Sequence, residues 1–378
     1  MLHPGPRLLI GSGRTPELAD WLPAGPVLVV TDGSVRALGL ADPLFEALGR
    51  TREVVLFDAV EADPSRATLM AAVEAGRGVT SVVGFGGGSP MDVAKIAAYL
   101  LGSGDDLDKI WGVGLARGRR LPLALVPTTA GTGSEATPVA IITVEGDEKR
   151  GVNSPVLIPD IAVLDAALTV GKPRALTAAT GIDAMVHAIE AYTSARAKNP
   201  LSDMQAREAL RLLGANLVRA CDTPSDLDAR QAMLIGAHLA GLAFANAPVA
   251  GVHALAYPLG GIHHLPHGLS NALMLRPVLS FNAEAAREPY AELAAILDPA
   301  AASFGSQAAA ARLIEQMEGL ILAAGLQPRL CDHGIAREEA PMLAREAMKQ
   351  QRLLINNPVP IGEDDARRLD RKSTRLNS

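Results

Sequence analysis

The chain has 378 residues, of which 48% are hydrophobic and 20% charged, a composition typical of a soluble globular protein with about two domains. The net charge of −6 and the 3% aromatic content argue against nucleic acid as a partner, because phosphate backbones need basic surfaces and single strands need stacking rings. Two cysteines, Cys221 and Cys331, exclude a disulfide scaffold and an all-cysteine zinc module. The first six residues lack the charged and apolar parts of a secretory signal, so a cytoplasmic location is expected.

Short apolar runs in the first half of the chain predict buried strands. They lie at 27–30, 81–85, 123–126 and 161–164, and each ends at a turn residue or a glycine run. Periodic segments such as 34–49 and 65–77 lie between the first of these runs and predict helices. Strands that alternate with helices are typical of an α/β domain with a parallel sheet covered on both faces.

Strand signals stop at about residue 173, and the rest of the chain predicts an all-α domain. Helical periodicity marks 182–196, 201–219, 227–245, 306–325 and 336–352, with Ser202 and Asp203 as candidate helix caps. The predicted domains are therefore 1–176 and 177–370. Residues 371–378 are polar and basic and interrupt the preceding helical pattern, so they are interpreted as a non-native tail.

The segment 231–275 contains no Asp, Glu, Lys or Arg and is long enough to span a bilayer. It also carries three prolines and five histidines: His238, His253, His263, His264 and His267. Imidazoles and broken helices are costly in lipid without partners. The segment is therefore predicted to line an enclosed polar site rather than to cross a membrane.

A glycine run, Gly86-Gly87-Gly88, follows a predicted strand and precedes a predicted helix. Ser89 suits the N-cap of this helix, Pro90 its first position and Asp92 its third. A plain turn before a well-capped helix is one interpretation. The position at the carboxyl end of a parallel strand favours the other, a phosphate held by the glycine amides and the helix start. The spacing is not the G-x-G-x-x-G of a standard Rossmann domain.

Two further loops follow predicted strands. Asp32 ends the first strand, where a carboxylate can bind the ribose hydroxyls of NAD and repel the 2′-phosphate of NADP; alternatively, Asp32 and Gly33 form only a turn. The loop 127–135 (PTTAGTGSE) is rich in hydroxyls that can hold a pyrophosphate or a carboxamide. An ordinary Ser/Thr-rich turn is the alternative.

One carboxylate and three imidazoles predict a metal site. Asp183 and His187 are four residues apart on a predicted helix and share one face, while His253 and His267 lie in the charge-free segment. Together they form a complete donor set for a borderline divalent ion. Each part alone is common, and a single buried histidine is usually a hydrogen-bonded core residue.

The sequence resembles the iron-containing (group III) alcohol dehydrogenase family through the segments GGGSPMD, PTTAGTGSE, GIDAMVHAIEAY and GVHALAYPLGGIHHLPHGLSNA, in this order. The resemblance implies a dehydroquinate synthase-like architecture: a dinucleotide-binding α/β domain, a helical domain and a metal in the cleft between them. It implies NAD, Fe²⁺ with Zn²⁺ as the alternative, a homodimer, and metal ligands at Asp183, His187, His253 and His267. The residues that it implies for dinucleotide contact are Asp32, Gly87, Gly88, Ser89, Asp92, Thr128, Thr129, Thr137, Lys149 and Leu168.

The predicted reaction is hydride transfer between NAD(H) and an alcohol–aldehyde or ketone pair, with the substrate oxygen polarised by the metal. Many relatives have a histidine where this chain has Tyr257, and a tyrosine hydroxyl is a poor base at neutral pH. The proton route therefore has two candidates: Tyr257 donates a hydrogen bond, or His263 or His264 takes the place of the missing histidine. Phe244 and Leu255 are expected to shape the substrate pocket together with Tyr257.

Three other functions are compatible with parts of the sequence. A maleylacetate reductase usually lacks the metal ligands, and a dehydroquinate synthase-like lyase needs a basic pocket, so both fit less well. A protein that binds NAD without catalysis is the third alternative.

Overall fold

The computed structural model describes residues 3–145 and 148–373 of the chain. The chain divides into two compact units, the first ending at Val170 and the second beginning at Gly171. The predicted boundary at 176 and 177 falls inside the first helix of the second unit, α5 (Arg174–Tyr192). Of the predicted tail, residues 374–378 lie outside the described residues. Residues 371–373 continue the helix α14 (Glu363–Ser373).

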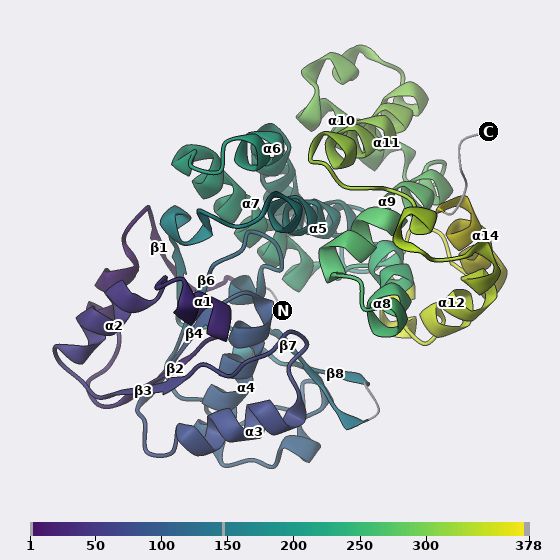
Figure 1. Ribbon diagram of the computed structural model, residues 1–378. Helices are drawn as coiled ribbons and strands as arrows, with labels where there is room; N and C mark the ends of the chain where they lie inside the picture. The colour runs from purple at the N-terminus through teal and green to yellow at the C-terminus, as the bar shows by residue number, and fades with distance from the viewer. Residues whose placement is uncertain (1–2, 146–147, 374–378) are drawn as a thin grey trace. The chain divides into compact units, whose positions relative to one another are not determined.

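The first unit contains a parallel sheet, which confirms the predicted α/β class. Its strands lie in the order β1-β9-β6-β4-β2-β3. Figure 1 labels all of these strands except β9. Their bounds are β1 (Arg7–Ile10), β2 (Val27–Val30), β3 (Val54–Phe57), β4 (Ser81–Gly86), β6 (Leu123–Pro127) and β9 (Ile161–Leu164). The runs at 27–30, 81–85, 123–126 and 161–164 are thus the four inner strands. The two edge strands, β1 and β3, were not predicted.

Alternate residues of each inner strand pack on opposite sides of the sheet. On β2, Leu28 and Val30 join a core formed with α3 (Arg66–Ala75) and α4 (Gly88–Ser103). Val27 and Val29 join a second core formed with η1 (Thr15–Asp20), α1 (Gly33–Ala37) and α2 (Asp42–Gly49). Because both faces are buried, the inner strands are continuously apolar. The segment 34–49, predicted as one helix, is two, since α1 ends at Ala37 and α2 begins at Asp42.

The order of the strands creates a switch point between β2 and β4. From β2 the chain moves outward to β3 at the edge, and then returns to β4 on the other side of β2. Ligands of open parallel sheets bind outside the carboxyl ends of the strands at such a point. Asp32 follows β2 after Thr31, the glycine run begins at the last residue of β4, and both flank this point.

A second, three-stranded sheet of the first unit joins β5 (Gly112–Val113), β7 (Val139–Thr143) and β8 (Lys149–Asn153). β7 and β8 pair in antiparallel fashion, and β8 pairs with β5 in parallel. This sheet was not predicted. Its strands are short; β7 alternates between half-buried and buried positions, and β8 is half-buried or exposed except at Val152.

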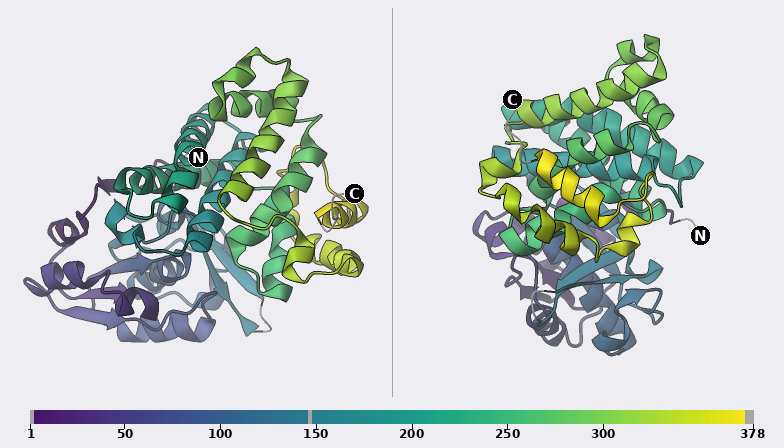
Figure 2. Two further views of the ribbon diagram at one scale, coloured as in Figure 1. Left: turned by 45° about the horizontal axis from the view of Figure 1, so that its top comes forward. Right: turned by 90° about the vertical axis from the view of Figure 1, so that its right-hand side faces the viewer.

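The second unit is helical, and it has no strand among its described residues, as predicted. After α5 it contains α6 (Pro200–Asp222), α7 (Leu227–Asn246), α8 (Gly251–His263), α9 (His267–Asn282), α10 (Arg287–Leu297), α11 (Ser306–Ala323), α12 (Ala340–Ala347), α13 (Gln351–Leu354) and α14. Figure 2 shows α12 and α14, in yellow, beside the green α8 and α9, with which they pack. The segment 336–352, predicted as one helix, is divided between α12 and α13.

The cap of α6 differs from the prediction. Asn199 is the N-cap and accepts hydrogen bonds from the backbone N–H groups of Leu201 and Ser202. Pro200 is the first helical residue, and Ser202 completes a capping box by accepting from the Asn199 N–H. The helix therefore begins one residue before the predicted segment, and its cap lies three residues before Ser202. A proline is tolerated at the first position because its missing N–H needs no partner there.

Among the described residues, no single helix is long and apolar enough to cross a membrane. The pair formed by α7 and α8 meets the length and composition criteria jointly but is bent by 107°.

Candidate metal and dinucleotide sites

Three helices of the second unit bring the four predicted metal ligands together. Asp183 and His187 lie one turn apart on α5, His253 lies in the first turn of α8, and His267 begins α9. The distance from Asp183 Oδ1 to Nε2 is 3.8 Å for His187 and His253 and 3.7 Å for His267. One donor atom from each residue lies within 4.8 Å of all the others. Donors around one tetrahedral ion lie about 3.4 Å apart, so the set is close to coordination geometry.

A glycine allows α9 to begin against α5. A Cβ at Gly268 would lie 2.3 Å from the carbonyl oxygen of Ala179 and 3.3 Å from the Asp183 Cβ. A backbone oxygen cannot move aside as a flexible side chain can. The close approach therefore requires glycine, and it brings the neighbouring His267 up to Asp183.

The cluster is buried on one side and open on the other. Asp183, His187 and His253 are buried, whereas the side chain of His267 is 47% exposed. Burial raises the pKa of Asp183, but the three histidines and a hydrogen bond from Asn271 outweigh it, so the pKa lies below its ordinary value. Asp183 is therefore a carboxylate at neutral pH.

Asn271 shows that the donor atoms converge on one point. Its Nδ2 lies 2.6 Å from Asp183 Oδ1, 3.2 Å from His253 Nε2 and 3.3 Å from His267 Nε2. A single hydrogen-bond donor thus reaches three of the four acceptors, the arrangement that a small cation also needs. A carboxylate with three imidazoles suits Fe²⁺ or Zn²⁺, so the residues fit the metal that the sequence predicts. The sequence did not single out Asn271.

Two aromatic rings lie beside two of the four donor residues. The ring of Phe244 lies 4.5 Å from that of His187, and the ring of Tyr257 lies edge-on, 6.2 Å from that of His267. Leu255, the third residue expected to shape a substrate pocket, is 1% exposed and belongs to the core.

The two histidines proposed as alternatives to Tyr257 lie at the end of α8. Nε2 of His263 is 3.2 Å from a carboxylate oxygen of Glu339. His264 is exposed and has a left-handed backbone conformation, with φ of 54°, where it ends the helix. The contacts of His263 and His264 are therefore those of residues at a helix end, and neither contact involves the four metal-binding candidates.

Glu190 was not predicted, although its spacing could have revealed it. It lies three residues beyond His187 on α5, so it shares the face of the metal ligands. Its buried carboxylate lies 2.7 Å from Nδ1 of His253.

At the switch point of the sheet, Asp32 and the glycine run lie side by side. Asp32 is the N-cap of α1 and accepts from the backbone N–H groups of Ser34 and Val35, both at 2.9 Å. A Cβ at Gly86 would lie 3.1 Å from Asp32 Oδ2, and the φ of Gly86, +152°, disfavours any other residue. The carboxylate of Asp32 therefore faces the end of β4.

The helix that follows the glycine run begins earlier than predicted. Its N-cap is Gly87 in an extended conformation and its first residue is Gly88, so Ser89 is not the cap. Pro90 still lies within the first turn, where its missing N–H has no intrahelical partner to lose. The prediction was wrong because it assumed a side-chain cap, which Gly87 does not supply.

The hydroxyl-rich loop approaches the start of α4. A Cβ on Gly87 would lie 3.7 Å from Thr129 Oγ1, and one on Gly88 would lie 3.1 Å from Thr132 Cγ2. Thr128 is buried, and its N–H donates to the carbonyl of Gly86 at 2.9 Å. Glycine amides and threonine hydroxyls thus line one edge of the sheet, together with Ser89 in the first turn of α4.

Two of the predicted dinucleotide contacts take part in a buried polar network. Asp92 accepts from Ser134 Oγ at 2.7 Å and from the Ile141 N–H at 2.9 Å. Burial raises the pKa of Asp92, although Lys95 and the two hydrogen bonds oppose the effect. Asp92 therefore connects α4 to the hydroxyl-rich loop and to β7.

The cation of this network is Lys95, which is completely buried. Its Nζ donates to Ser134 Oγ at 2.8 Å, to Thr137 Oγ1 at 3.2 Å and to the carbonyl of Val139 at 2.7 Å. Burial lowers its pKa to about 8, despite the nearby Asp92 and Glu135. Thr137 thus takes part in the network through its hydroxyl.

The two remaining predicted contacts lie elsewhere in the first unit. Nζ of Lys149, on β8, is 2.7 Å from a carboxylate oxygen of Asp63. Leu168 is 6% exposed in η6 (Ala166–Thr169) and packs in the core on the α1 and α2 side of the sheet.

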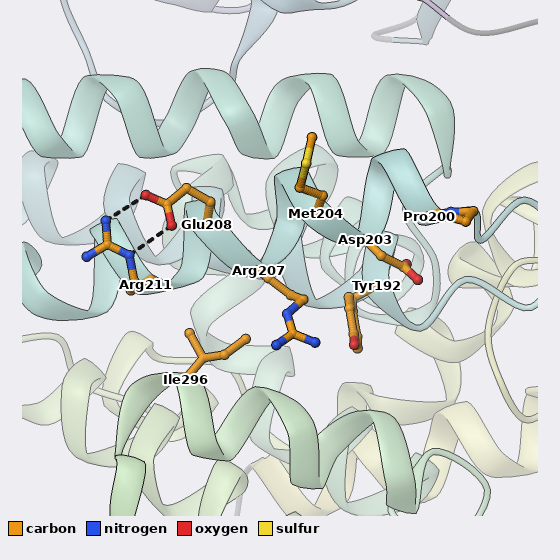
Figure 3. A pocket seen from close by; sticks show the side chains of 8 residues that line it. All are labelled: Tyr192, Pro200, Asp203, Met204, Arg207, Glu208, Arg211 and Ile296. Atoms are coloured by element: carbon orange, nitrogen blue, oxygen red, sulfur yellow. Dashed lines mark hydrogen bonds and ion pairs between the residues drawn. The ribbon is translucent and has the colours of Figure 1, made fainter.

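A separate hollow of about 690 Å³ lies in the second unit. Its lining residues come from α5, α6 and α10: Tyr192, Pro200, Asp203, Met204, Arg207, Glu208, Arg211 and Ile296 (Figure 3). Glu208 and Arg211 pair with each other at its rim. The four metal-binding candidates do not line this hollow.

Comparisons with known proteins agree with the fold and the cluster. The sequence model "Iron-containing alcohol dehydrogenase" matches residues 5–166, and the model "Fe-containing alcohol dehydrogenase family, C-terminal" matches residues 177–373. Long-chain-alcohol dehydrogenase 1 of Geobacillus thermodenitrificans is 38% identical, over 90% of this chain and 87% of its own length. Sulfoacetaldehyde reductase of Bilophila wadsworthia is 33% identical, over 95% of each chain.

A solved structure of 1,3-propanediol oxidoreductase superposes with a TM-score of 0.94 at 33% identity, and the match covers 98% of both chains. The parallel sheet, the helical second unit and the Asp/His cluster thus define a metal- and dinucleotide-dependent oxidoreductase. The chain belongs to the iron-containing alcohol dehydrogenase family, and it is an NAD-dependent alcohol–aldehyde oxidoreductase of that family.

Proposed function

We propose that Asp183, His187, His253 and His267 hold one divalent cation, with Fe²⁺ as the first candidate and Zn²⁺ as the second. The observation that carries the proposal is the convergence of four donor atoms from three helices within 4.8 Å. A cation bound there supplies Lewis acidity that polarises an alcohol or carbonyl oxygen. The absence of a thiolate donor leaves iron and zinc both compatible with the set.

The residues around the four donors orient the substrate in this proposal. Phe244 and Tyr257 offer apolar surface beside the ligand rings, which favours the hydrocarbon part of a small or medium-sized primary alcohol. Tyr257 Oη serves as a hydrogen-bond donor toward the substrate oxygen. The burial of the other donors excludes water from all but the His267 side.

We propose that NAD binds at the switch point of the sheet in the first unit. Gly87, Gly88 and the N-terminal turn of α4 offer backbone N–H groups to the pyrophosphate. Asp32 accepts hydrogen bonds from the adenosine ribose, and Thr129 lies where a hydroxyl reaches the same ligand. The remaining predicted contacts belong to this proposal too: Ser89, Asp92, Thr128, Thr137, Lys149 and Leu168. NAD⁺ accepts the hydride in alcohol oxidation, and NADH donates it in the reverse direction.

Removal of the metal tests the proposed site. The chelator-treated protein is expected to lose about 100-fold or more of its alcohol-dependent NADH formation, because no residue replaces the Lewis acid. Activity is expected to return with Fe²⁺ or Zn²⁺, measured at 340 nm on a panel of primary alcohols. Undiminished turnover in protein shown to be free of metal by elemental measurement would exclude the proposed role.

Cofactor choice tests the role of Asp32. Asp32→Ser keeps a side-chain oxygen for the cap of α1 but removes the negative charge, so we expect the ratio of kcat/KM for NADP to that for NAD to rise about tenfold or more. Asp106, which caps η2 (Leu107–Lys109), allows the same change as a control. Asp106→Ser is expected to leave the ratio unchanged. An equal ratio in Asp32→Ser and the unmodified protein would contradict ribose recognition by Asp32.

The homodimer implied by the resemblance and the cytoplasmic location expected from the N-terminal sequence stay predictions. Size-exclusion chromatography with light scattering measures the oligomeric state, and fractionation of the source cells measures the location.

A further inference from the structure

Glu190 is a buried carboxylate that contacts a proposed metal ligand without belonging to the donor set. Its side chain is 5% exposed and comes from α5. Oε2 lies 2.7 Å from His253 Nδ1 and accepts from the Ala250 N–H at 2.9 Å. Oε1 accepts from the Val252 N–H at 2.6 Å. One side chain thus contacts a ligand ring and the backbone next to it.

The two backbone contacts place the start of α8. Ala250 is the N-cap of this helix and Val252 is its second residue, and the N–H groups there have no partner within the helix. A carboxylate at this end satisfies two of them, and its charge interacts favourably with the helix dipole. Glu190 therefore holds the turn that carries His253 against α5.

The contact to the ring selects one form of His253. A carboxylate only accepts hydrogen bonds, so the ring nitrogen that faces it, Nδ1, must carry the hydrogen. In the neutral ring this leaves the lone pair on Nε2, the atom that lies 3.8 Å from Asp183 Oδ1 within the cluster. Carboxylate partners of this kind also make an imidazole a more basic ligand.

We infer that Glu190 is a positioning residue of the metal site, which acts through His253 Nδ1 and the first turn of α8 to present Nε2 to the cation. The inference rests on the proposed function, because it assumes that His253 binds the metal. The inference adds Glu190 to the metal site as a residue that supports a ligand without being a ligand itself.

Glu190→Gln tests the inference because glutamine has nearly the same shape. If its amide oxygen faces His253, its NH₂ group meets the Val252 N–H, donor against donor. If it turns the other way, Nδ1 must accept and the hydrogen moves to Nε2, which removes the lone pair from the site. Either arrangement is expected to raise the dissociation constant for Zn²⁺ about 10- to 100-fold. Titration of the full-length, chelator-treated protein against a competing chromophoric chelator measures it.

Asp165→Asn is the matched control, because Asp165 is also a buried carboxylate that accepts from backbone N–H groups, those of Gly13 and Thr15, but in the first unit. This control is expected to change the Zn²⁺ dissociation constant less than about threefold, whatever its effect on stability. Wild-type affinity in Glu190→Gln, or an equal loss in Asp165→Asn, would overturn the inference.

Two further variants complete the test. Glu190→Asp keeps the charge but moves it away from His253, so we expect a smaller loss of Zn²⁺ affinity than in Glu190→Gln. If Glu190→Gln does not fold, Glu190→Asp takes its place in the test. Unchanged Zn²⁺ affinity in Glu190→Asp would then overturn the inference. Asp183→Asn, measured in parallel, separates the two hypotheses. Wild-type Zn²⁺ affinity in Asp183→Asn contradicts the proposed metal site itself, whereas loss there with wild-type affinity in Glu190→Gln contradicts only the role of Glu190.

Discussion

Asp183→Asn is expected to lower kcat/KM for alcohol oxidation by about 10³-fold or more, equivalent to about 4 kcal/mol of transition-state stabilisation. Asp183 is the single anionic donor of the set, and its Oδ1 lies within 3.8 Å of Nε2 of all three histidines. An amide carries no charge, so the cation loses its strongest electrostatic partner. The measurement is NADH formation at saturating Fe²⁺ or Zn²⁺, with bound metal counted in the same samples.

Asp222→Asn is the control for this variant. Asp222 ends α6 and pairs at the surface with Arg174, with a side chain that is 56% exposed. Loss of such a pair changes stability by less than about 1 kcal/mol and is expected to leave kcat/KM unchanged. Metal content near one ion per chain together with full activity in Asp183→Asn would show that the four residues do not form the catalytic metal site.

Lys95→Met is expected to lower the free energy of unfolding by about 3 kcal/mol at pH 7, because it breaks a buried charged network by removing one side. The three acceptors of the Lys95 ammonium would lose their donor, and Asp92 would lose its cation 4.0 Å away. Urea unfolding followed by circular dichroism measures the loss.

The same network predicts a pH dependence. The pKa of Lys95 is lowered to about 8 in the folded chain, mainly by burial, while the unfolded chain keeps the ordinary value of 10.5. Between these values the unfolded chain binds more protons than the folded one, so the unfolding free energy contributed by Lys95 increases with pH. The stability difference between the unmodified protein and Lys95→Met is therefore expected to widen by up to about 3 kcal/mol from pH 8 to pH 10.5.

Lys349→Met provides the comparison for an exposed lysine. Lys349 pairs with Glu346 and has a side chain that is 67% exposed, so its loss is expected to change stability by less than about 0.5 kcal/mol. A stability difference between the unmodified protein and Lys95→Met that stays constant from pH 8 to pH 10.5 would contradict the lowered pKa of Lys95.

The inner strands of the sheet were predictable from the sequence because burial on both faces makes them continuously apolar. The edge strands β1 and β3 were not predicted; β3 (Val54–Phe57) is continuously apolar like the inner strands, but both edge strands are partly exposed. The helices α8 and α9 were also not predicted. Both are apolar around most of their circumference, and each contains a proline, Pro258 or Pro277, so neither shows a clear amphipathic period.

The helix starts show the same limit. Periodicity located α6, but its first turn depends on Asn199 and Pro200, which precede the periodic part. The start of α4 depends on the extended backbone of Gly87, and no capping side chain at that position marks the helix start in the sequence. Such ends are decided by local hydrogen bonding rather than by hydrophobic spacing.

By itself, the sequence determined the α/β class of the first unit and the helical second unit, because these depend on residue type and on spacing along single elements. The candidate donor set came from the spacing of Asp183 and His187 on one helix and from two histidines of a charge-free segment, and its metal-binding role stays a proposal. Only the tertiary structure decided which side chains support the donors. Glu190 and Asn271 reach His253 from other helices, and Lys95 meets its acceptors across distant segments. Hydrogen bonds act over about 3 Å, so such partners are set by how elements pack and not by their order in the chain.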